Sequence, residues 1–314
     1  MNKIITLTVN PAVDKNSTVK NLLPDNKLRC SAPSFEAGGG GINVSRAIKE
    51  LGGDSLCLFF GGGFSGDHLE QLVSEGGIRH KRIQTNEWTR ENLSVVDEAN
   101  GKQYRFVMPG ANITREEKET ILREIESAVE EGDYLVASGS LPPGMDVDFY
   151  AGVTEIVNAK NAKVILDTSG EPLKHGAKAG VFMLKPNLNE LSFLCGVPHL
   201  SGMQVQQKAR EFLAENNCQS LVVSMGPKGA LLVTPEIVEH VPAPPVLMKN
   251  TVGAGDSMVA GMTLALTRGM RMREVIRYGV ACGTAATMTE GADLIRKEDV
   301  DHLFRWINTF QAEK

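Results

Sequence analysis

The sequence predicts an α/β fold in which helices flank a doubly wound, mostly parallel sheet. Short β-rich segments alternate with helical patterns along most of the chain, as in repeated βαβ units. Several strand segments are continuously apolar, as expected for strands covered on both faces. The chain has 314 residues, of which 42% are hydrophobic and 23% charged, so it can form a large domain with a buried core.

The predicted elements follow in a regular order. Short apolar runs predict strands at residues 4–9, 56–60, 134–138, 163–167, 181–185, 220–224 and 230–234. Apolar residues at helical spacing predict helices at residues 42–51, 66–75, 115–131, 148–161, 187–195, 203–216, 256–268 and 272–289. Right-handed crossovers would bring the carboxyl ends of the strands to one edge of the sheet, where ligands bind.

Two regions break this alternation, at approximately residues 13–35 and 88–108. In the second, two alternating runs flank Asn100-Gly101, a pair that favours a type I′ hairpin turn. We predict that both regions form a small β-sheet that stands off the main sheet, within a single domain of residues 1–314. This sheet would serve as a lid, as a dimer contact, or as both; a surface hairpin without a role is the alternative.

Composition argues against several classes of protein. The formal net charge of −5 gives no reason to expect binding to nucleic acid or to a membrane. The five cysteines include no CxxC pair and the six histidines are scattered, so neither a disulfide framework nor a zinc site is expected. The first residues do not resemble a signal peptide, and no apolar run reaches roughly 18 residues, so we expect a cytoplasmic protein.

The segment NTVGAGDSMVAGM, residues 250–262, is typical of a glycine-rich loop that leads into an apolar helix. Gly253, Ala254 and Gly255 would point backbone N–H groups at an anion, which the helix dipole also favours. Asp256 either caps the helix, or it is a general base that takes the proton of a substrate hydroxyl while the loop holds a phosphoryl group. The chain has no GxxxxGK[ST] and this motif has no GxGxxG, which argues against a P-loop and a dinucleotide site.

Two more helix starts carry polar residues. Gly38 to Gly41 precede a helix with an apolar stripe, so the backbone there can approach a compact polar ligand whose hydroxyls Asn43 can bind. Asn187 and Glu190 lie one turn apart, and a carboxylate beside an amide suits a hydrated Mg²⁺. Capping of the helix by the same two side chains is the alternative.

Two segments end predicted strands. SMGPKGALLV, residues 224–233, is predicted as strand, glycine turn and strand. Its turn is either an ordinary hairpin or a cover for nucleotide phosphates that uses its backbone and Lys228. ASGSLPPG, residues 137–144, places Ser138 and Ser140 at the edge of the sheet where ligands bind.

Together these motifs resemble the ribokinase-like sugar kinases of the PfkB family, over essentially the whole chain. GAGD and its helix resemble the C-terminal signature of that family, and the glycine-rich helix start resembles the N-terminal one. WTRENL, QYRFVMPGA and KPNLNEL add to the resemblance. It implies a ribokinase-like fold with a β-sheet lid, and an ATP-dependent phosphotransferase with an alcohol acceptor.

The resemblance also bears on the substrate. Family members that act on fructose 1-phosphate or tagatose 6-phosphate usually read GGKG where this chain has Gly38 to Gly41. This difference favours fructose 6-phosphate, phosphorylated on its 1-hydroxyl to fructose 1,6-bisphosphate in glycolysis. A kinase for one of the other two sugars and a non-catalytic sensor of phosphosugar or nucleotide are the alternatives, and the retained Asp256 argues against the sensor.

The resemblance implies roles for individual residues. Asp256 is the base, and Gly253, Ala254 and Gly255 form the anion hole. The phosphosugar is expected at Asp14, Lys27, Arg29, Gly39, Gly40, Asn43, Arg90, Arg105, Ser138 and Ser140, and ATP at Lys185, Asn187, Ser224, Gly226, Lys228 and Gly229. A dianionic sugar phosphate needs fixed cations, and the four cationic residues of the first set all fall in the predicted lid regions.

The expected cofactors are Mg²⁺ and a monovalent cation, K⁺. Glu190 resembles the acid associated with Mg²⁺, acting through water. Asn250, Val252 and Gly291 are the candidates for K⁺. Lys27 matches a position that reaches the site of the neighbouring subunit in a homodimer joined through the lid.

Overall fold

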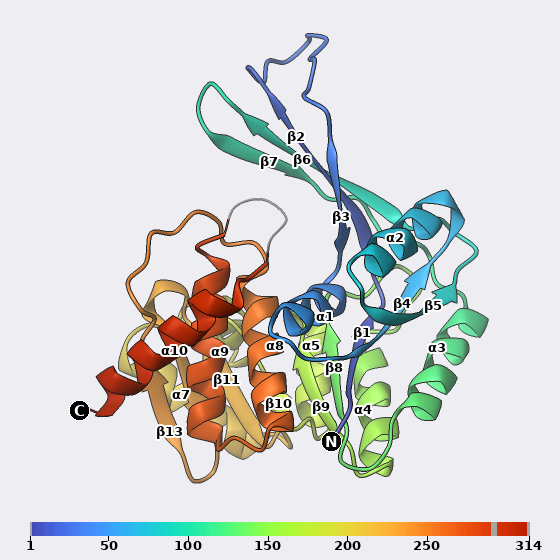
Figure 1. The fold of residues 1–314 in the computed structure, drawn as a ribbon. Coiled ribbons are helices and arrows are strands. Elements are labelled where there is room, and N and C mark those ends of the chain that lie inside the picture. Colours follow the sequence, from blue (N-terminus) through green and yellow to red (C-terminus); the bar gives the residue numbers. More distant parts are fainter. Residues whose placement is uncertain (1, 290–293, 313–314) are drawn as a thin grey trace.

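The computed structural model describes residues 2–289 and 294–312, and β-sheets organise these ranges (Figure 1). The large sheet contains β1 (Ile4–Thr8), β4 (Leu56–Gly61), β5 (Arg79–Gln84), β8 (Tyr134–Ser138), β9 (Lys163–Asp167), β10 (Met183–Leu184), β11 (Ser220–Ser224), β12 (Ala230–Val233) and β13 (Val238–Val241). Its order is β13-β12-β11-β10-β9-β8-β1-β4-β5. All neighbours from β11 to β5 pair in parallel, and β12 and β13 are antiparallel additions at one edge. The predicted doubly wound, mostly parallel sheet is confirmed.

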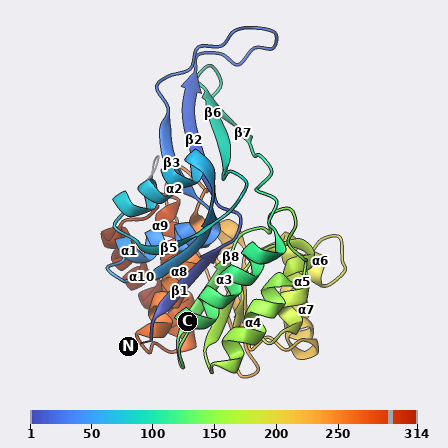
Figure 2. The same ribbon diagram turned by 90° about the vertical axis from the view of Figure 1, so that its right-hand side faces the viewer.

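Helices cover both faces of this sheet (Figure 2). One face carries α1 (Gly40–Glu50), α2 (Gly63–Glu75), α8 (Ala254–Thr267), α9 (Met272–Ala286) and α10 (Lys297–Ala312). The other carries α3 (Arg115–Ala128), α4 (Phe149–Ala159), α5 (Gly170–Lys178), α6 (Leu188–Leu194) and α7 (Met203–Glu215). Successive strand residues serve opposite cores, because side chains alternate along a strand: Leu135 packs with the second group and Val136 with the first. In the described ranges, no helix combines the length and the apolar character needed to cross a membrane.

Most predicted elements are found within a few residues of their expected bounds, but four were missed. These are β5, β13, α5 and α10. β5 reads RHKRIQ and lies at the sheet edge, where only Ile83 is fully buried, so it shows no apolar run. α10 does bury a stripe of Val300, Leu303 and Ile307, which was a signal in the sequence that the prediction did not use.

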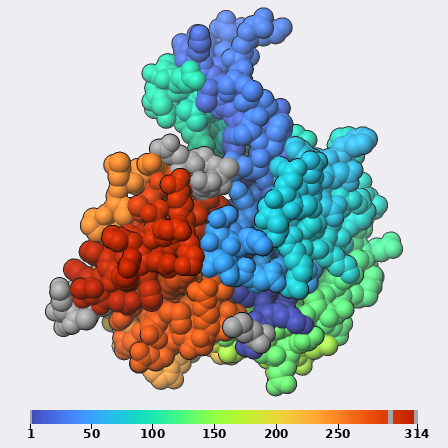
Figure 3. Space-filling model, in the orientation of Figure 1, coloured from blue at the N-terminus to red at the C-terminus, as the bar shows by residue number. Residues whose placement is uncertain are grey.

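A second sheet projects from the body as an arm, drawn at the top of the space-filling view (Figure 3). It contains β2 (Ala12–Val19), β3 (Ser34–Gly38), β6 (Arg90–Asp97) and β7 (Lys102–Phe106), in the order β3-β2-β6-β7. We call it the small sheet. It is built from the two regions that broke the helix–strand alternation, and its existence confirms that part of the prediction.

The hairpin between β6 and β7 forms at the predicted place, but its turn is not type I′. A type I′ turn needs a positive φ at both central residues. In the described residues Gly101 has a φ of 68°, whereas Asn100 is not among the non-glycine residues with positive φ. The Asn100 N–H donates to Asp97 O at 3.3 Å and the Gly101 N–H donates to the same oxygen at 2.8 Å. The loop therefore spans residues 98–101, four residues instead of the two predicted, with Gly101 in the left-handed region.

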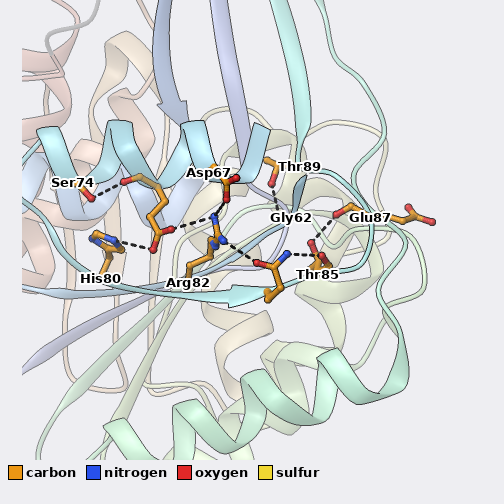
Figure 4. Close-up of polar contacts among 10 residues, drawn as sticks. Gly62, Asp67, Ser74, His80, Arg82, Thr85, Glu87 and Thr89 are labelled. Atoms are coloured by element: carbon orange, nitrogen blue, oxygen red, sulfur yellow. Dashed lines mark hydrogen bonds and ion pairs between the residues drawn. The ribbon is translucent and has the colours of Figure 1, made fainter. Parts of the chain in front are cut away.

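The connection from β5 to β6, residues 85–89, is fastened to the start of α2 (Figure 4). The Gly62 N–H donates to Thr89 Oγ1 at 3.1 Å, and the Thr89 N–H donates to Gly62 O at 3.0 Å. Thr85 Oγ1 donates to Glu87 O at 2.9 Å. These bonds fix the backbone immediately before Arg90, the first residue of β6, at the base of the small sheet.

Candidate active site

Helix α8 begins two residues earlier than predicted, and this places Asp256 differently from a capping residue. Gly253 is the N-cap, in the left-handed region with a φ of 76°, which glycine adopts without strain. Ala254, Gly255 and Asp256 form the first turn of the helix. Backbone N–H groups in a first turn lack partners within the helix and carry the positive end of its dipole. The geometry fits an anion-binding helix start, with a carboxylate held inside it.

The Asp256 carboxylate is held by side chains from other elements. Asn43 Nδ2, on α1, donates to Asp256 Oδ2 at 2.9 Å, and the Ser138 side chain at the end of β8 also hydrogen bonds to it. Burial raises the pKa of Asp256 to about 7, and the negative charge of Asp167 adds to this, while Asn43, Lys185 and Ser138 oppose it. A base with a pKa near neutral pH is suited to proton transfer.

Lys185 and Asp167 form a buried ion pair beside this helix start. Lys185 Nζ lies 3.1 Å from Asp167 Oδ1, and a Cβ added at Gly255 would lie 3.6 Å from that ammonium. Burial lowers the pKa of Lys185, but the attraction of Asp167, Glu190 and Asp256 outweighs it and the net pKa is raised. A fixed cation therefore lies next to the predicted anion hole. Asp167 was missed from sequence, although it ends a parallel strand at the edge where ligands bind.

The predicted sugar-binding residues meet where the small sheet joins the body. Asp14, on β2, accepts a hydrogen bond from Asn92 Nδ2 at 2.7 Å. A Cβ at Gly38 would lie 2.2 Å from Asp14 Oδ2, and one at Gly40 would lie 2.2 Å from Ser138 Oγ. The glycine run thus lets the side chains of Asp14 and Ser138 lie directly against its backbone. Asn92 was missed from sequence.

The four cationic residues predicted for the sugar phosphate are placed unequally. Arg90 is half-buried at the base of the small sheet, and Arg105 lines a cavity of about 580 Å³ that Asp14 and Asn92 also line. Lys27 and Arg29 are exposed in the connection between β2 and β3 and do not line that cavity. Of these four residues, only Arg105 lines that cavity and only Arg90 is half-buried.

Arg90 donates to backbone oxygens alone among the described residues. Its Nη2 donates to Asn10 O at 2.9 Å, its Nε to Pro11 O at 3.3 Å and its Nη1 to Met108 O at 3.1 Å. Burial lowers its pKa, and the negative charge of Asp14 partly opposes this. A guanidinium has five N–H donors, so at least two remain for a ligand. A desolvated cation held only by carbonyls suits an anionic ligand.

The predicted nucleotide residues lie together at the ends of β10 and β11. Asn187 forms a bridge with Ser224, followed by a turn of residues 226–228 in which Gly226 is left-handed with a φ of 57°. Lys228 is exposed in this turn, and Gly229, with a φ of 87°, leads into β12 as the hairpin prediction required.

Asn187 and Glu190 make the capping box that was the alternative to a metal role. Asn187 Oδ1 accepts from the Asn189 and Glu190 N–H groups, and the Asn187 N–H donates to Glu190 Oε2 at 2.8 Å. Burial raises the pKa of Glu190, and the neighbouring Asp167 adds to this. In the part of the chain that the structure describes, no cluster of three or more Asp, Glu, His or Cys side chains could by itself enclose a metal ion. A cation here would keep most of its waters, as Mg²⁺ does.

The predicted K⁺ residues are only partly described. Asn250 Oδ1 accepts from the Val252 N–H at 3.0 Å, and both residues line the 580 Å³ cavity. Gly291, the third candidate, lies outside the described residues.

A helix start suited to anions, a carboxylate with a pKa near 7 and a buried lysine lie together, and groups of these kinds can serve transfer of a phosphoryl group to an alcohol. The class is that of α/β phosphotransferases, as the following comparisons show. The model of the pfkB family of carbohydrate kinases matches residues 5–298, and the chain belongs to this family.

Its relatives cover almost the whole chain. ATP-dependent 6-phosphofructokinase isozyme 2 from Escherichia coli (strain K12) is 40% identical over 312 residues, 98% of this chain and 100% of the relative. The 1-phosphofructokinase of Borreliella burgdorferi is 32% identical, over 91% of this chain and 92% of the relative.

Solved structures of phosphofructokinase-2 from Escherichia coli match the fold closely. They have TM-scores of 0.94 in complex with potassium, 0.92 in complex with fructose-6-phosphate and 0.93 in a tetrameric inhibited form. Their sequence identities are 39%, 38% and 39%, and each match covers 98% of this chain and 100% of the other. The ribokinase-like fold expected from the resemblance is confirmed.

Proposed function

We propose that this chain is an ATP-dependent 6-phosphofructokinase, which transfers the γ-phosphoryl group of ATP to the 1-hydroxyl of fructose 6-phosphate. The observation that carries the proposal is Asp256, a carboxylate with a pKa of about 7 in the first turn of α8, beside Lys185. Identity to 6-phosphofructokinase isozyme 2 over the whole chain supports the substrate.

The chain's own groups divide the work. The N–H groups of the Gly253–Gly255 helix start and the Lys185 ammonium stabilise negative charge on the transferred phosphoryl group. Asp256 accepts the proton of the attacking hydroxyl, and Asn43 holds the carboxylate in place at 2.9 Å. Asp14 and Asn43 bind sugar hydroxyls, while Arg90, Ser140 and Arg105 bind the 6-phosphate.

The nucleotide lies over the ends of β10 and β11. Lys185, Asn187, Ser224 and the 226–229 turn contact it from one side. Mg²⁺, when bound, neutralises charge on the phosphate oxygens. Glu190 would hold that ion through water, because its carboxyl lies one turn from the Asn187 amide at the end of β10. The oxygens of residues 250–252 would serve K⁺.

The small sheet is proposed to act as a lid that excludes water and as a dimer contact. Its outer part exposes apolar side chains that include Phe35, Tyr104 and Phe106. Lys27, exposed on the arm, would reach the partner subunit's site in such a dimer. The tetrameric form of the Escherichia coli relative makes a larger assembly a further outcome to test.

A coupled ADP-release assay with MgATP tests the function. It compares kcat/KM for fructose 6-phosphate, tagatose 6-phosphate, fructose 1-phosphate and unphosphorylated fructose. A clear preference for fructose 6-phosphate is expected. Preference for another phosphosugar would keep the mechanism and reject the substrate, and no turnover with any of them would leave only a sensor of these ligands.

A further inference from the structure

Asn10 lies between two groups that the proposed function assigns to the 6-phosphate. It follows β1 and precedes Pro11, at the crossing from the large sheet to the small sheet. Its Nδ2 donates to Ser140 Oγ at 3.0 Å and more weakly to Leu141 O at 3.4 Å. Its main-chain oxygen accepts from Arg90 Nη2 at 2.9 Å. One residue thus contacts both candidate phosphate ligands.

The backbone of Asn10 is well suited to fix Arg90. A residue before proline is restricted largely to extended conformations, which limits the direction of the Asn10 carbonyl. The carbonyls of Asn10 and Pro11 accept from Nη2 and Nε of the same guanidinium. The main chain of Arg90 is also held, because the hydrogen bonds between Gly62 and Thr89 fix the residue immediately before it. The guanidinium is therefore oriented by backbone on two sides.

The side chain of Asn10 is not explained by stability alone. Its Oδ1 is buried and accepts no hydrogen bond from any residue in the described ranges. A Cβ at Gly110 would lie 2.1 Å from this oxygen, so the chain packs tightly against it. A buried unpaired carbonyl oxygen costs stability, and a smaller apolar residue would avoid that cost. The half of the amide that does have a partner is directed at Ser140.

We propose that Asn10 is a positioning residue for the sugar phosphate, which holds Ser140 through its side chain and Arg90 through its main chain. This inference rests on the proposed function, since it assumes that Arg90 and Ser140 bind the 6-phosphate. It adds a residue that touches neither the reacting hydroxyl nor ATP, so its effect falls on binding of the phosphosugar.

Two variants of Asn10 test it by steady-state kinetics. Asn10→Ala removes the bond to Ser140 and keeps the main-chain oxygen, so KM for fructose 6-phosphate should rise about three- to tenfold, the effect of one neutral hydrogen bond. Asn10→Asp keeps the shape, loses both N–H donors and adds a negative charge near the phosphate, so KM should rise by more than roughly tenfold. In both, kcat and KM for MgATP should stay close to those of the unaltered enzyme.

A double-mutant cycle shows whether Asn10 acts through Ser140. The effect of Asn10→Ala on KM should shrink in a Ser140→Ala background, because the bond is already lost there. Additive effects would contradict the positioning role. Asn2→Ala is the matched control, since Asn2 is exposed at the opposite end of the same strand and should leave every parameter unchanged.

Folding is checked by the thermal transition of each variant, and if Asn10→Asp does not fold, the alanine variant and the cycle decide. The inference would be overturned if KM for fructose 6-phosphate did not change, or if kcat fell and KM for MgATP rose by as much as KM for fructose 6-phosphate. Arg90→Ala separates it from the proposed function. If Arg90→Ala leaves KM unchanged, the phosphate site itself is wrong; if it raises KM while the Asn10 variants do not, only the role of Asn10 is wrong.

Discussion

The pKa of Asp256 makes a prediction that can be worked from its surroundings. Four side chains from four different segments act on this carboxyl: Asp167 on β9 raises its pKa in addition to burial, and Asn43, Lys185 and Ser138 lower it. Only the ionised form accepts a proton. With a pKa of about 7, about one tenth of the enzyme is active at pH 6 and nine tenths at pH 8, so kcat/KM should rise about tenfold between these values.

The perturbation is Asp167→Asn, which keeps the size of the side chain and removes its charge. Two effects then act in one direction. Asp256 loses a repulsive neighbour, and Lys185 loses the partner 3.1 Å from its Nζ and becomes available to Asp256. Both lower the pKa of Asp256, so the rise of kcat/KM should move to lower pH and the ratio between pH 8 and pH 6 should approach one. Asn43→Ala removes a stabilising hydrogen bond and should move the rise to higher pH.

The assay is kcat/KM for fructose 6-phosphate from pH 5.5 to 9, in buffers of constant ionic strength. The substrate phosphate itself titrates near pH 6, roughly. This contribution is the same for all variants, so only the displacement between profiles is interpreted. The reasoning is refuted if Asp167→Asn and Asn43→Ala leave the profile in place, or if both displace it in the same direction.

The other predictions concern single side chains. Asp256→Asn should bind both substrates and lose turnover by about 10² to 10⁴; near-normal kcat would reject the base. The same variant should melt at a higher temperature than the parent at pH 8 and at a similar temperature near pH 4. Asp256 is protonated in the folded protein at low pH, and the free-energy cost of its buried charge is fully present once the pH has risen through about 7. Arg90→Ala should raise KM for fructose 6-phosphate with little change in KM for MgATP, and the opposite pattern would place Arg90 elsewhere. Glu190→Gln should increase the Mg²⁺ concentration needed for half-maximal rate, measured at fixed free ATP; an unchanged requirement would leave Glu190 only its capping role.

The sequence predicted the large sheet because its strands are buried on both faces and therefore continuously apolar. Leu135 and Val136 serve different cores, so neither face could be polar. The same criterion missed β5, where the outer edge of the sheet is exposed. It also could not fix the turn after β6, because Asn-Gly is compatible with more than one loop and the pairing of Asp97 with Lys102 decides which one forms.

Candidate site residues could be named from the sequence where they lie in local motifs, and could not where contacts join distant segments. Gly253 to Asp256 form a motif that a reader of the sequence can recognise. Asp167, Asn92 and Asn10 have no such motif, and their side-chain partners lie in other segments of the chain. Asn10 and Ser140 are 130 positions apart, and Asp14 and Asn92 are 78 apart. Strand ends are a partial signal, since Asp167 ends the parallel strand β9 and Asn10 lies two residues after the parallel strand β1.

The environment of Asp256 is better explained by catalysis than by stability. Raising its pKa from 3.8 to about 7 disfavours the ionised form by on the order of 4 kcal/mol, a penalty that the fold carries at neutral pH. A protein selected only for stability would place a neutral side chain in this position, or would remove Asp167 from its neighbourhood. The same penalty gives the carboxylate enough basicity to accept a hydroxyl proton at neutral pH. Asn43 and Lys185 limit this rise, because both lower the pKa of the carboxyl.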